Sequence, residues 1–388
     1  MISRAVSKKV CPQAVVSPGI SHCGRAEARP SPWRAQREGR ASARPCGGKT
    51  SGKLQKNLNR SSPTRRLILA ALVSLLPAAC RPPAASLPPP SDTLAASGAV
   101  RSLDTALAAV SGDRALRFAT DFADLGPKVS GTPGAAAAAE WLLARFVEDG
   151  VSATQHPFTD DAPSGPVPFC NVVATIPPAP GTVPPGAAPR LLLVAAHYDT
   201  KSGIPGFVGA NDSASGVAVL FELARAWSAH PLPGTEIRLA CLDGEECAVA
   251  YGPRDGLHGS RHWAGSLESS GDLPRIRAFL LLDMVGDADL TLTLPRNCTP
   301  SLLTLAFESA RAEGMRNRLS LFPGAVLDDH VPFLDRGVPA LDLIDFHYGS
   351  APALNDYWHT PADTPDKLSA GSLALSARLA LRIAAALP

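Results

Sequence analysis

Several histidine and carboxylate side chains of this chain stand at the ends of mainly apolar runs. Asp, Glu and His offer the oxygen and nitrogen atoms that bind a catalytic zinc ion. Four runs end this way: Leu191–Ala196 before His197 and Asp199, Ile237–Leu242 before Asp243, Glu245 and Glu246, Ala278–Leu282 before Asp283, and Val338–Ile344 before Asp345. If these run ends meet in the folded chain, their side chains could bind a metal and move protons.

The runs themselves indicate how their ends would meet. Apolar stretches of this length, with at most one charged interruption, are typical of central strands buried on both faces of a sheet. In open α/β sheets the ligand crevice lies just beyond the carboxyl ends of such strands. We therefore expect a metal site at one edge of a sheet.

Three residues have the types found in a catalytic zinc site with one open position: Asp212, Glu246 and His359. Each also has a simpler explanation. Asp212 stands at the start of a predicted helix, where Asp is a favoured N-cap, and a lone His is more often structural. Glu245 and Glu246 could be exposed, although burying two adjacent glutamates is costly unless one binds a metal or is protonated. The long spacings alone do not justify grouping the three residues.

The segments around the runs predict one α/β domain over residues 99–388, with a largely parallel central sheet flanked by helices. Apolar periodicity and Pro or Gly signals predict the remaining elements. The expected helices are Leu103–Phe122, Ala135–Glu148, Ser213–Ala229, Gly259–Ser266 and Leu302–Glu313, and the further strands are Val151–Phe158 and Asn171–Ile176.

Charge divides the chain into two parts. Residues 1–66 hold 15 Lys and Arg against 2 Asp and Glu, whereas the rest holds 22 against 33. The acidic remainder argues against nucleic-acid binding by the folded part. Residues 1–60 lack sustained apolar periodicity, so we expect them to be disordered. A basic arm that binds nucleic acid is the alternative for that segment.

Residues 61–80 are similar to a secretory signal. Arg65 and Arg66 precede the apolar stretch Leu67–Ala79, which is too short to span a bilayer comfortably. We therefore expect an exported protein. Residues 1–60 would then be upstream translation from a mis-assigned start.

Cys80 follows two alanines, as the lipidated residue of a bacterial lipoprotein does, although Pro77 stands where that cleavage box usually has Leu. We expect a periplasmic protein or a lipoprotein attached to a bacterial membrane through Cys80. Residues 81–98 are rich in Pro and Ala and predict an extended tether. The cysteines of the domain are Cys170, Cys241, Cys247 and Cys298; no two have the spacing of a zinc pair, and we expect buried thiols.

Seven short motifs are spread over roughly residues 100–385. They are His197-Tyr198-Asp199, Gly209–Ala214, Asp243–Glu246, Gly259–His262, Leu282-Asp283, Asp328–Phe333 and Trp358–Thr360. Together they resemble the zinc aminopeptidase-like family, whose α/β fold they imply. The Asp-Asp-His-Val-Pro-Phe motif and the Trp before the last His resemble the animal-type glutaminyl-peptide cyclotransferases within it.

The resemblance implies that Asp212, Glu246 and His359 bind one zinc ion and that Glu245 is a proton shuttle. The implied reaction converts the N-terminal Gln of a peptide to pyroglutamate with release of ammonia. Zinc would polarise the side-chain amide as a Lewis acid. Glu245 would take a proton from the α-amine and return it to the departing nitrogen.

The resemblance also implies that Asp283 and Asp328 form a hydrogen-bonded acid pair and that Trp358 is a wall of the substrate pocket. Two carboxyl groups in contact would share a proton, because like charges cannot both ionise cheaply there. Either acid could instead be an ordinary strand-end or surface group. The implied partners are peptides or proteins with N-terminal Gln, and we expect a monomer.

The sequence departs from the family pattern at several places. The family often has a disulfide that starts just before the first His, but Ala196 stands there and Gly216 stands near the expected partner, so that bridge is absent. Tyr251 replaces an expected Trp after the double glutamate. Asp342 replaces a His of the family pattern, so the hydrogen-bond partner of Asp328 stays open. The loop Phe346–Tyr357 has no clear match.

Two other functions are consistent with the same residues. A two-zinc aminopeptidase would hold a second metal through His197 and Asp283, with Asp212 bridging the two ions and Glu245 activating a water. The loop motifs favour a cyclotransferase over a two-zinc aminopeptidase. A non-catalytic binding module is less expected, because such proteins typically lose the metal ligands or the Glu base, and this chain keeps them.

Overall fold

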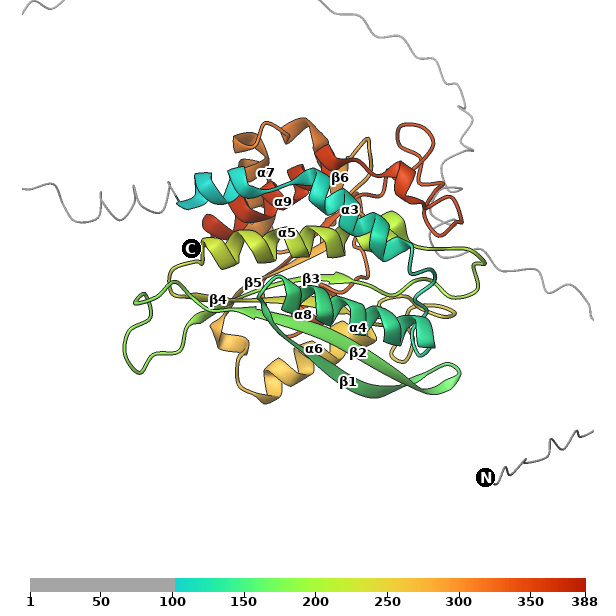
Figure 1. The fold of residues 1–388 in the computed structure, drawn as a ribbon, viewed down its shortest axis with the longest axis horizontal. Coiled ribbons are helices and arrows are strands. Elements are labelled where there is room, and N and C mark those ends of the chain that lie inside the picture. Colours follow the sequence, from blue (N-terminus) through green and yellow to red (C-terminus); the bar gives the residue numbers. More distant parts are fainter. Residues whose placement is uncertain (1–101) are drawn as a thin grey trace, which may run out of the picture. The chain divides into compact units, whose positions relative to one another are not determined.

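Six strands form the central sheet of residues 102–388, which are the residues that the computed structural model describes (Figure 1). Their order is β1-β2-β4-β3-β5-β8. The four apolar runs are confirmed as strands: β3 Arg190–His197, β4 Thr235–Leu242, β5 Ile276–Asp283 and β8 Ala340–Ile344. Neighbours among these four pair in parallel, so their carboxyl ends lie at one edge of the sheet.

The other two strands form an antiparallel hairpin at the side of the sheet. β1 is Ser152–Ala162 and β2 is Gly165–Ile176, and β2 also pairs antiparallel with β4. Both strands extend beyond the expected segments. Pro157 and Pro166 lie in this hairpin. Before Val172, β2 pairs only with β1, and strands with one unpaired side tolerate residues without an N–H group.

Side chains alternate between two apolar cores along each central strand. On β3, Leu192 and Val194 belong to one core, and Leu191 and Leu193 to the other. The larger core packs against α3, α4, α5, α7 and α9, and the smaller packs against α6 and α8. Because both faces are covered, these strands carry continuous apolar runs.

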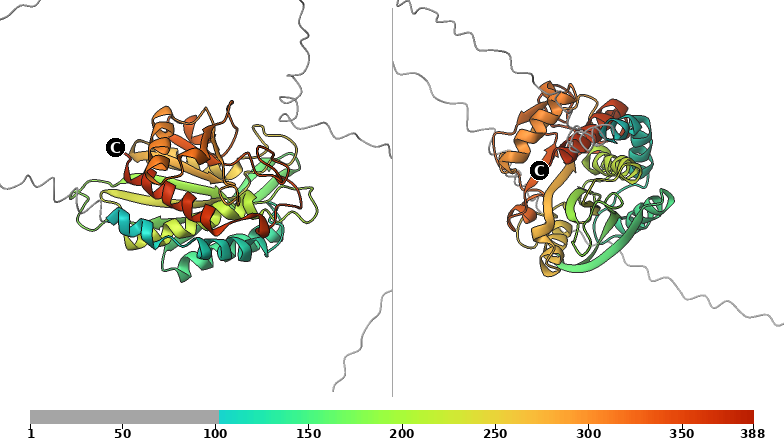
Figure 2. Two further views of the ribbon diagram at one scale, coloured as in Figure 1. Left: turned by 90° about the horizontal axis from the view of Figure 1, so that it is seen from above. Right: turned by 90° about the vertical axis from the view of Figure 1, so that its left-hand side faces the viewer.

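Helices cover the sheet as the alternation of elements predicts. They are α3 Gly112–Ala123, α4 Pro133–Glu148, α5 Gly216–Ala229, α6 His258–Ser269, α7 Pro300–Ala312, α8 Val331–Leu334 and α9 Ala370–Ala385. Seen along the strands, the sheet separates α6 from α3 and α5 (Figure 2). The α9 helix was not predicted, nor was the two-stranded sheet of β6 Leu292–Leu294 and β7 Leu319–Leu321.

One expected helix is wrong in extent. Leu103–Phe122 is two helices, over residues 102–109 and over α3. The break lies at Ser111, whose backbone is extended and whose side chain accepts the amide of Arg114 as an N-cap. The Ser111 amide donates to Glu222 on α5 at 2.9 Å, and this bond fixes the break against the rest of the fold.

The expectations for residues 1–98 lie outside the described residues. These are the basic segment, the export signal, Cys80 and the tether. From residue 102 onward, no helix combines the length and the apolar character that a membrane span requires. In the same part of the chain Cys170, Cys241, Cys247 and Cys298 are all free thiols, in agreement with the absent bridge.

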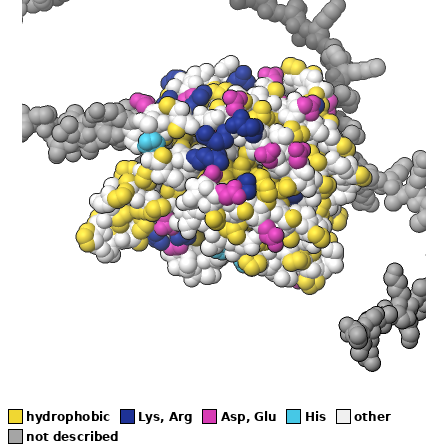
Figure 3. Space-filling view, in the orientation of Figure 1, with side chains coloured by type: hydrophobic (Ala, Val, Ile, Leu, Met, Phe, Trp, Pro, Cys, Tyr) yellow, Lys and Arg dark blue, Asp and Glu magenta, His cyan; other side chains and the backbone are white. Residues whose placement is uncertain are grey.

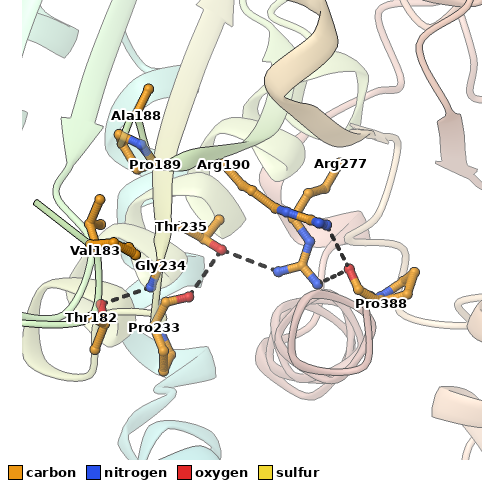
Figure 4. Close-up of a pocket in the computed structure, with 11 residues that line it drawn as sticks. Thr182, Val183, Ala188, Pro189, Arg190, Pro233, Gly234, Thr235, Arg277 and Pro388 are labelled. Atoms are coloured by element: carbon orange, nitrogen blue, oxygen red, sulfur yellow. Dashed lines mark hydrogen bonds between the residues drawn. The ribbon is translucent and has the colours of Figure 1, made fainter. Parts of the chain in front are cut away.

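A cavity of about 390 Å³ lies where β3, β4 and β5 begin, at the edge opposite the acidic strand ends. Arg190, Thr235 and Arg277 line it together with Pro388 (Figure 4). Both arginines donate to the Pro388 carbonyl oxygen, Arg190 at 3.3 Å. Figure 3 shows Lys and Arg side chains gathered near the centre of one face. The cavity is therefore distinct from the crevice predicted at the strand ends.

Candidate metal centre and active site

The ends of β3 and β4 are tied together by Asp199. The chain leaves β3 at His197, and the Asp199 carboxylate accepts the backbone amides of Glu245 and Glu246, each at 3.1 Å. These two hydrogen bonds fix the backbone of the tight turn that carries both glutamates after β4. The sequence marks Asp199 only as a strand-end acid; the structure shows that it positions the turn.

Asp212 lies in an irregular turn over Ala210–Ser215, not at a helix cap. Its backbone is non-helical (φ −106°, ψ 76°), its side chain makes no capping bond, and α5 begins only at Gly216. The Asp363 carboxylate holds the turn by accepting the amides of Asn211 and Asp212 at 2.7 and 3.1 Å. The simpler reading of Asp212 as an N-cap is therefore wrong, and Asp363 is a positioning residue that sequence reasoning missed.

The structure brings Asp212, Glu246 and His359 together although they are far apart in the sequence. The His359 Nε2 atom lies 2.9 Å from Glu246 Oε1 and 3.3 Å from Asp212 Oδ2. One ligand atom from each residue lies within 4.8 Å of the other two. His359 adopts a left-handed backbone (φ 53°), which is unusual for a side chain with a Cβ and indicates that its surroundings impose the conformation.

The electrostatics of this cluster favour a cation. Burial alone would lower the pKa of His359, but Glu246 and Asp212 raise it to about 9. Burial would likewise raise the pKa of Asp212, but hydrogen bonds from His197 and His359 lower it. Asp212 Oδ2 is buried, and His359 Nε2 lies 3.3 Å from it. One imidazole nitrogen and two carboxylates are a set of donors that a zinc ion takes.

A second cluster shares Asp212. His197 Nε2 lies 3.1 Å from Asp212 Oδ1 and 3.3 Å from Asp283 Oδ1, and these three residues also offer atoms within 4.8 Å of one another. All three are buried. The residues of both clusters, with Asp212 between them, thus match the set that a two-metal site would need.

Glu245 is buried beside the first cluster. Its Oε1 atom accepts the hydroxyl of Tyr251 at 2.7 Å. Burial, and after it the neighbouring Glu246, raise the pKa of Glu245 well above its usual range. A carboxyl group with a raised pKa can both accept and return a proton at neutral pH.

Asp283 and Asp328, the expected acid pair, each have another hydrogen-bond partner. Asp283 and Asp328 are both buried, and burial followed by Asp283 raises the pKa of Asp328 well above its usual range. The hydrogen-bond partner of Asp283 is His197, however, and Asp328 accepts the amide of Asp329 at 2.6 Å. Asp342, at the place of the expected His, is fully buried, and its carboxylate oxygens have no hydrogen-bond partner.

Aromatic side chains stand beside the first cluster. The Trp358 ring stacks on His359 with centroids 4.1 Å apart, and Phe207 meets His359 edge-on at 6.1 Å. Phe346, from the loop with no clear sequence match, lies edge-on to Trp358 at 6.3 Å. Trp358 is partly exposed, so its ring can form an apolar wall next to the candidate ligands.

Comparison with known proteins bears directly on this arrangement. The model of peptidase family M28 matches residues 171–384. The mouse glutaminyl-peptide cyclotransferase-like protein is 41% identical over 246 residues, which are 55% of this chain and 59% of the mouse protein. The Drosophila melanogaster glutaminyl-peptide cyclotransferase is 30% identical over 65% of this chain and 76% of its own length.

Among solved structures, the crystal structure of an Acidobacteriales bacterium glutaminyl cyclase has a TM-score of 0.64 and 35% identity. That likeness covers 71% of this chain and 93% of the cyclase. The resemblance expected from the sequence motifs is therefore confirmed. This chain belongs to peptidase family M28 and, within it, to the glutaminyl-peptide cyclotransferases.

Proposed function

We propose that the chain is a zinc-dependent glutaminyl-peptide cyclotransferase, an acyltransferase that converts the N-terminal Gln of peptides to pyroglutamate. The observation that carries this proposal is the convergence of Asp212, Glu246 and His359 beside the buried carboxyl group of Glu245. Family membership supports it, because the Drosophila relative is a glutaminyl-peptide cyclotransferase and the Acidobacteriales structure is a glutaminyl cyclase.

Asp212, Glu246 and His359 would hold one zinc ion. When bound there, zinc would supply Lewis-acid polarisation of the substrate's side-chain amide. Two aspartates hold the ligand-bearing turns in place. Asp363 fixes the turn that carries Asp212, and Asp199 fixes the turn that carries Glu246. Pre-positioned ligands of this kind need little rearrangement on binding.

Glu245 would move the proton that the cyclisation requires. The α-amine nitrogen forms a bond to the side-chain amide carbon, and the bond from that carbon to the amide nitrogen breaks. Glu245 accepts one proton from the attacking amine and delivers it to the departing nitrogen, which leaves as ammonia. The raised pKa of Glu245 suits both halves of this transfer.

The remaining residues would bind and orient the substrate. Trp358, which is partly exposed and stacks on His359, offers an apolar surface where the glutaminyl side chain would lie. Asp283 and Asp328 would share protons in the buried acid group behind the site, because not all of these carboxyl groups can ionise together.

A two-zinc aminopeptidase is the second candidate, and the observation that favours it is Asp212 itself. This residue belongs to both clusters, as a bridging ligand would, and His197 and Asp283 complete the second cluster. In that reading Glu245 would take a proton from a water molecule. The glutaminyl cyclase relatives weigh against it.

Products and metal content separate the two candidates. The purified protein is incubated with a Gln-peptide and, separately, with aminoacyl chromogenic substrates, and its zinc is quantified. We expect ammonia, a pyroglutamyl peptide and one zinc per chain. Release of free amino acids without ammonia, together with two zinc ions per chain, would overturn the proposal.

Export is part of the same proposal. Arg65, Arg66 and the apolar stretch Leu67–Ala79 support a signal, and the position of Cys80 supports membrane attachment through a lipid. Mass spectrometry of the N-terminus of the protein made in a bacterial host tests both points. We expect processing at Cys80 with a lipid on that residue; an intact, unprocessed N-terminus would contradict the proposal.

A further inference from the structure

Tyr251 makes a direct contact with the proposed proton shuttle. Its hydroxyl donates to Glu245 Oε1 at 2.7 Å. Hydrogen bonds to a carboxylate are among the stronger ones in proteins, particularly where water is excluded. Because Tyr251 engages Oε1, Oε2 is the oxygen of this carboxyl group that could exchange a proton with a substrate.

The loop that carries Tyr251 is built to hold this contact. The Asp255 carboxylate accepts three successive amides, those of Ala248, Val249 and Ala250, at 2.5 to 2.8 Å. Gly252 and Asp255 exchange backbone hydrogen bonds at 3.0 and 3.2 Å across the base of the turn. These bonds fix the backbone on both sides of the tyrosine.

The tyrosine ring is confined from two sides. Gly256 has a left-handed backbone (φ 75°), and a Cβ there would lie 2.5 Å from Tyr251 Cδ1, so the ring packs directly on the glycine backbone. Lys201 places its Nζ 5.7 Å from the ring centroid and 3.3 Å from Glu246 Oε2. A cation at this distance over the ring face is attracted to it electrostatically.

We propose that Tyr251 is a positioning residue for the reaction, and that its hydroxyl holds the Glu245 carboxyl group in the orientation that aims Oε2 at the reacting nitrogen atoms. This inference deepens the proposed function and rests on Glu245 acting as the proton carrier.

Tyr251→Phe tests the inference, because it removes one oxygen atom and keeps the ring. Orientation of Glu245 matters for proton transfer but not for substrate binding. We therefore expect kcat for a Gln-peptide to fall about ten- to hundredfold, with KM changed less than about twofold and zinc content unchanged. A purely structural role would lower the melting temperature without this separation of kcat from KM.

Tyr198→Phe is the matched control. It also removes a buried tyrosine hydroxyl, which donates to the Cys170 carbonyl oxygen at 2.8 Å. We expect its kcat to stay within about twofold of the wild type, even if both variants lose similar thermal stability. Gly256→Ala is the second variant: it keeps every functional group but pushes the Tyr251 ring, so kcat should again fall more than KM changes.

Each outcome has a distinct meaning. Wild-type kcat in Tyr251→Phe, with pyroglutamate still formed by the wild type, overturns this inference and leaves the proposed function intact. If the wild type forms no pyroglutamate but cleaves aminoacyl substrates, the proposed function fails. The same variants are then compared on those substrates, where Glu245 would still carry the proton and Tyr251→Phe should still lower kcat.

Discussion

Two histidine–carboxylate clusters share Asp212, but they differ in how far they are enclosed. The His359 side chain of the first cluster is 19% exposed and lies beside Trp358, whereas the His197 side chain of the second is 1% exposed. A catalytic metal needs a side that a substrate can reach. The comparison therefore favours the first cluster as the place where chemistry occurs.

The second cluster is better described as a support. His197 faces Asp199 with one ring nitrogen, at 3.4 Å, and two further aspartates with the other. Burial alone would lower the pKa of His197, but hydrogen bonds to these three carboxylates raise it well above its usual value. A protonated His197 would supply there the positive charge that a second metal supplies in a two-metal site.

The largest expected effect follows from removing the shared residue. Asp212→Ala should abolish zinc binding and turnover, because it takes a ligand from the first cluster and leaves two histidines without their common carboxylate. Atomic emission measures the zinc, and ammonia release measures the turnover. Unchanged zinc content would show that the site is misassigned.

Glu245→Gln should separate chemistry from metal binding. We expect zinc content to stay at the wild-type level, since Glu246 and not Glu245 faces His359. Turnover should fall by a factor of about 100 to 10,000, the usual contribution of a general acid–base group. Activity near the wild-type level would exclude Glu245 as the proton carrier.

Substituting each histidine in turn distinguishes a metal ligand from a supporting residue. His359→Asn should release the zinc, whereas His197→Asn should retain one zinc per chain and reduce turnover and stability more moderately, since it loses a buried brace and not a ligand. Zinc analysis of both variants is the measurement. A fall from two zinc ions to one in His197→Asn would mean that the second cluster also holds a metal.

The smallest expected effect is on the pH dependence of stability. In zinc-free protein, the folded-state pKa of His359, about 9, lies above the value of about 6.5 for the unfolded chain. Its contribution is therefore complete below about pH 6.5 and is lost as pH rises through about 9, an effect of up to about 3 kcal/mol. Urea unfolding of chelated protein, with His359→Asn as control, measures it. If the free energy of unfolding changed with pH equally in both proteins, the raised pKa of His359 would be contradicted.

The strand ends could be predicted from the sequence for a clear physical reason. A sheet covered on both faces demands continuous apolar strands, so the first polar residue after each run marks its end. His197, Glu245 and Asp283 were found in this way, and parallel pairing brought those ends to one edge.

Other parts of the site had no such local signal. His359 comes from a loop, and its left-handed backbone is imposed by distant neighbours. Asp363 acts through amides some 150 residues earlier in the chain, at 211 and 212. The resemblance to a family identified His359, and only coordinates identified Asp363 and the Tyr251 hydrogen bond. The helix break at Ser111 was missed for the same reason, since Glu222 fixes it from α5.

One zinc ion is expected among Asp212, Glu246 and His359. Anomalous diffraction from crystals of the purified protein, recorded on both sides of the zinc absorption edge, locates the metal directly. We predict a single peak at bonding distance from a side-chain atom of each of these three residues. Two peaks flanking Asp212, or a peak elsewhere in the fold, would contradict this account.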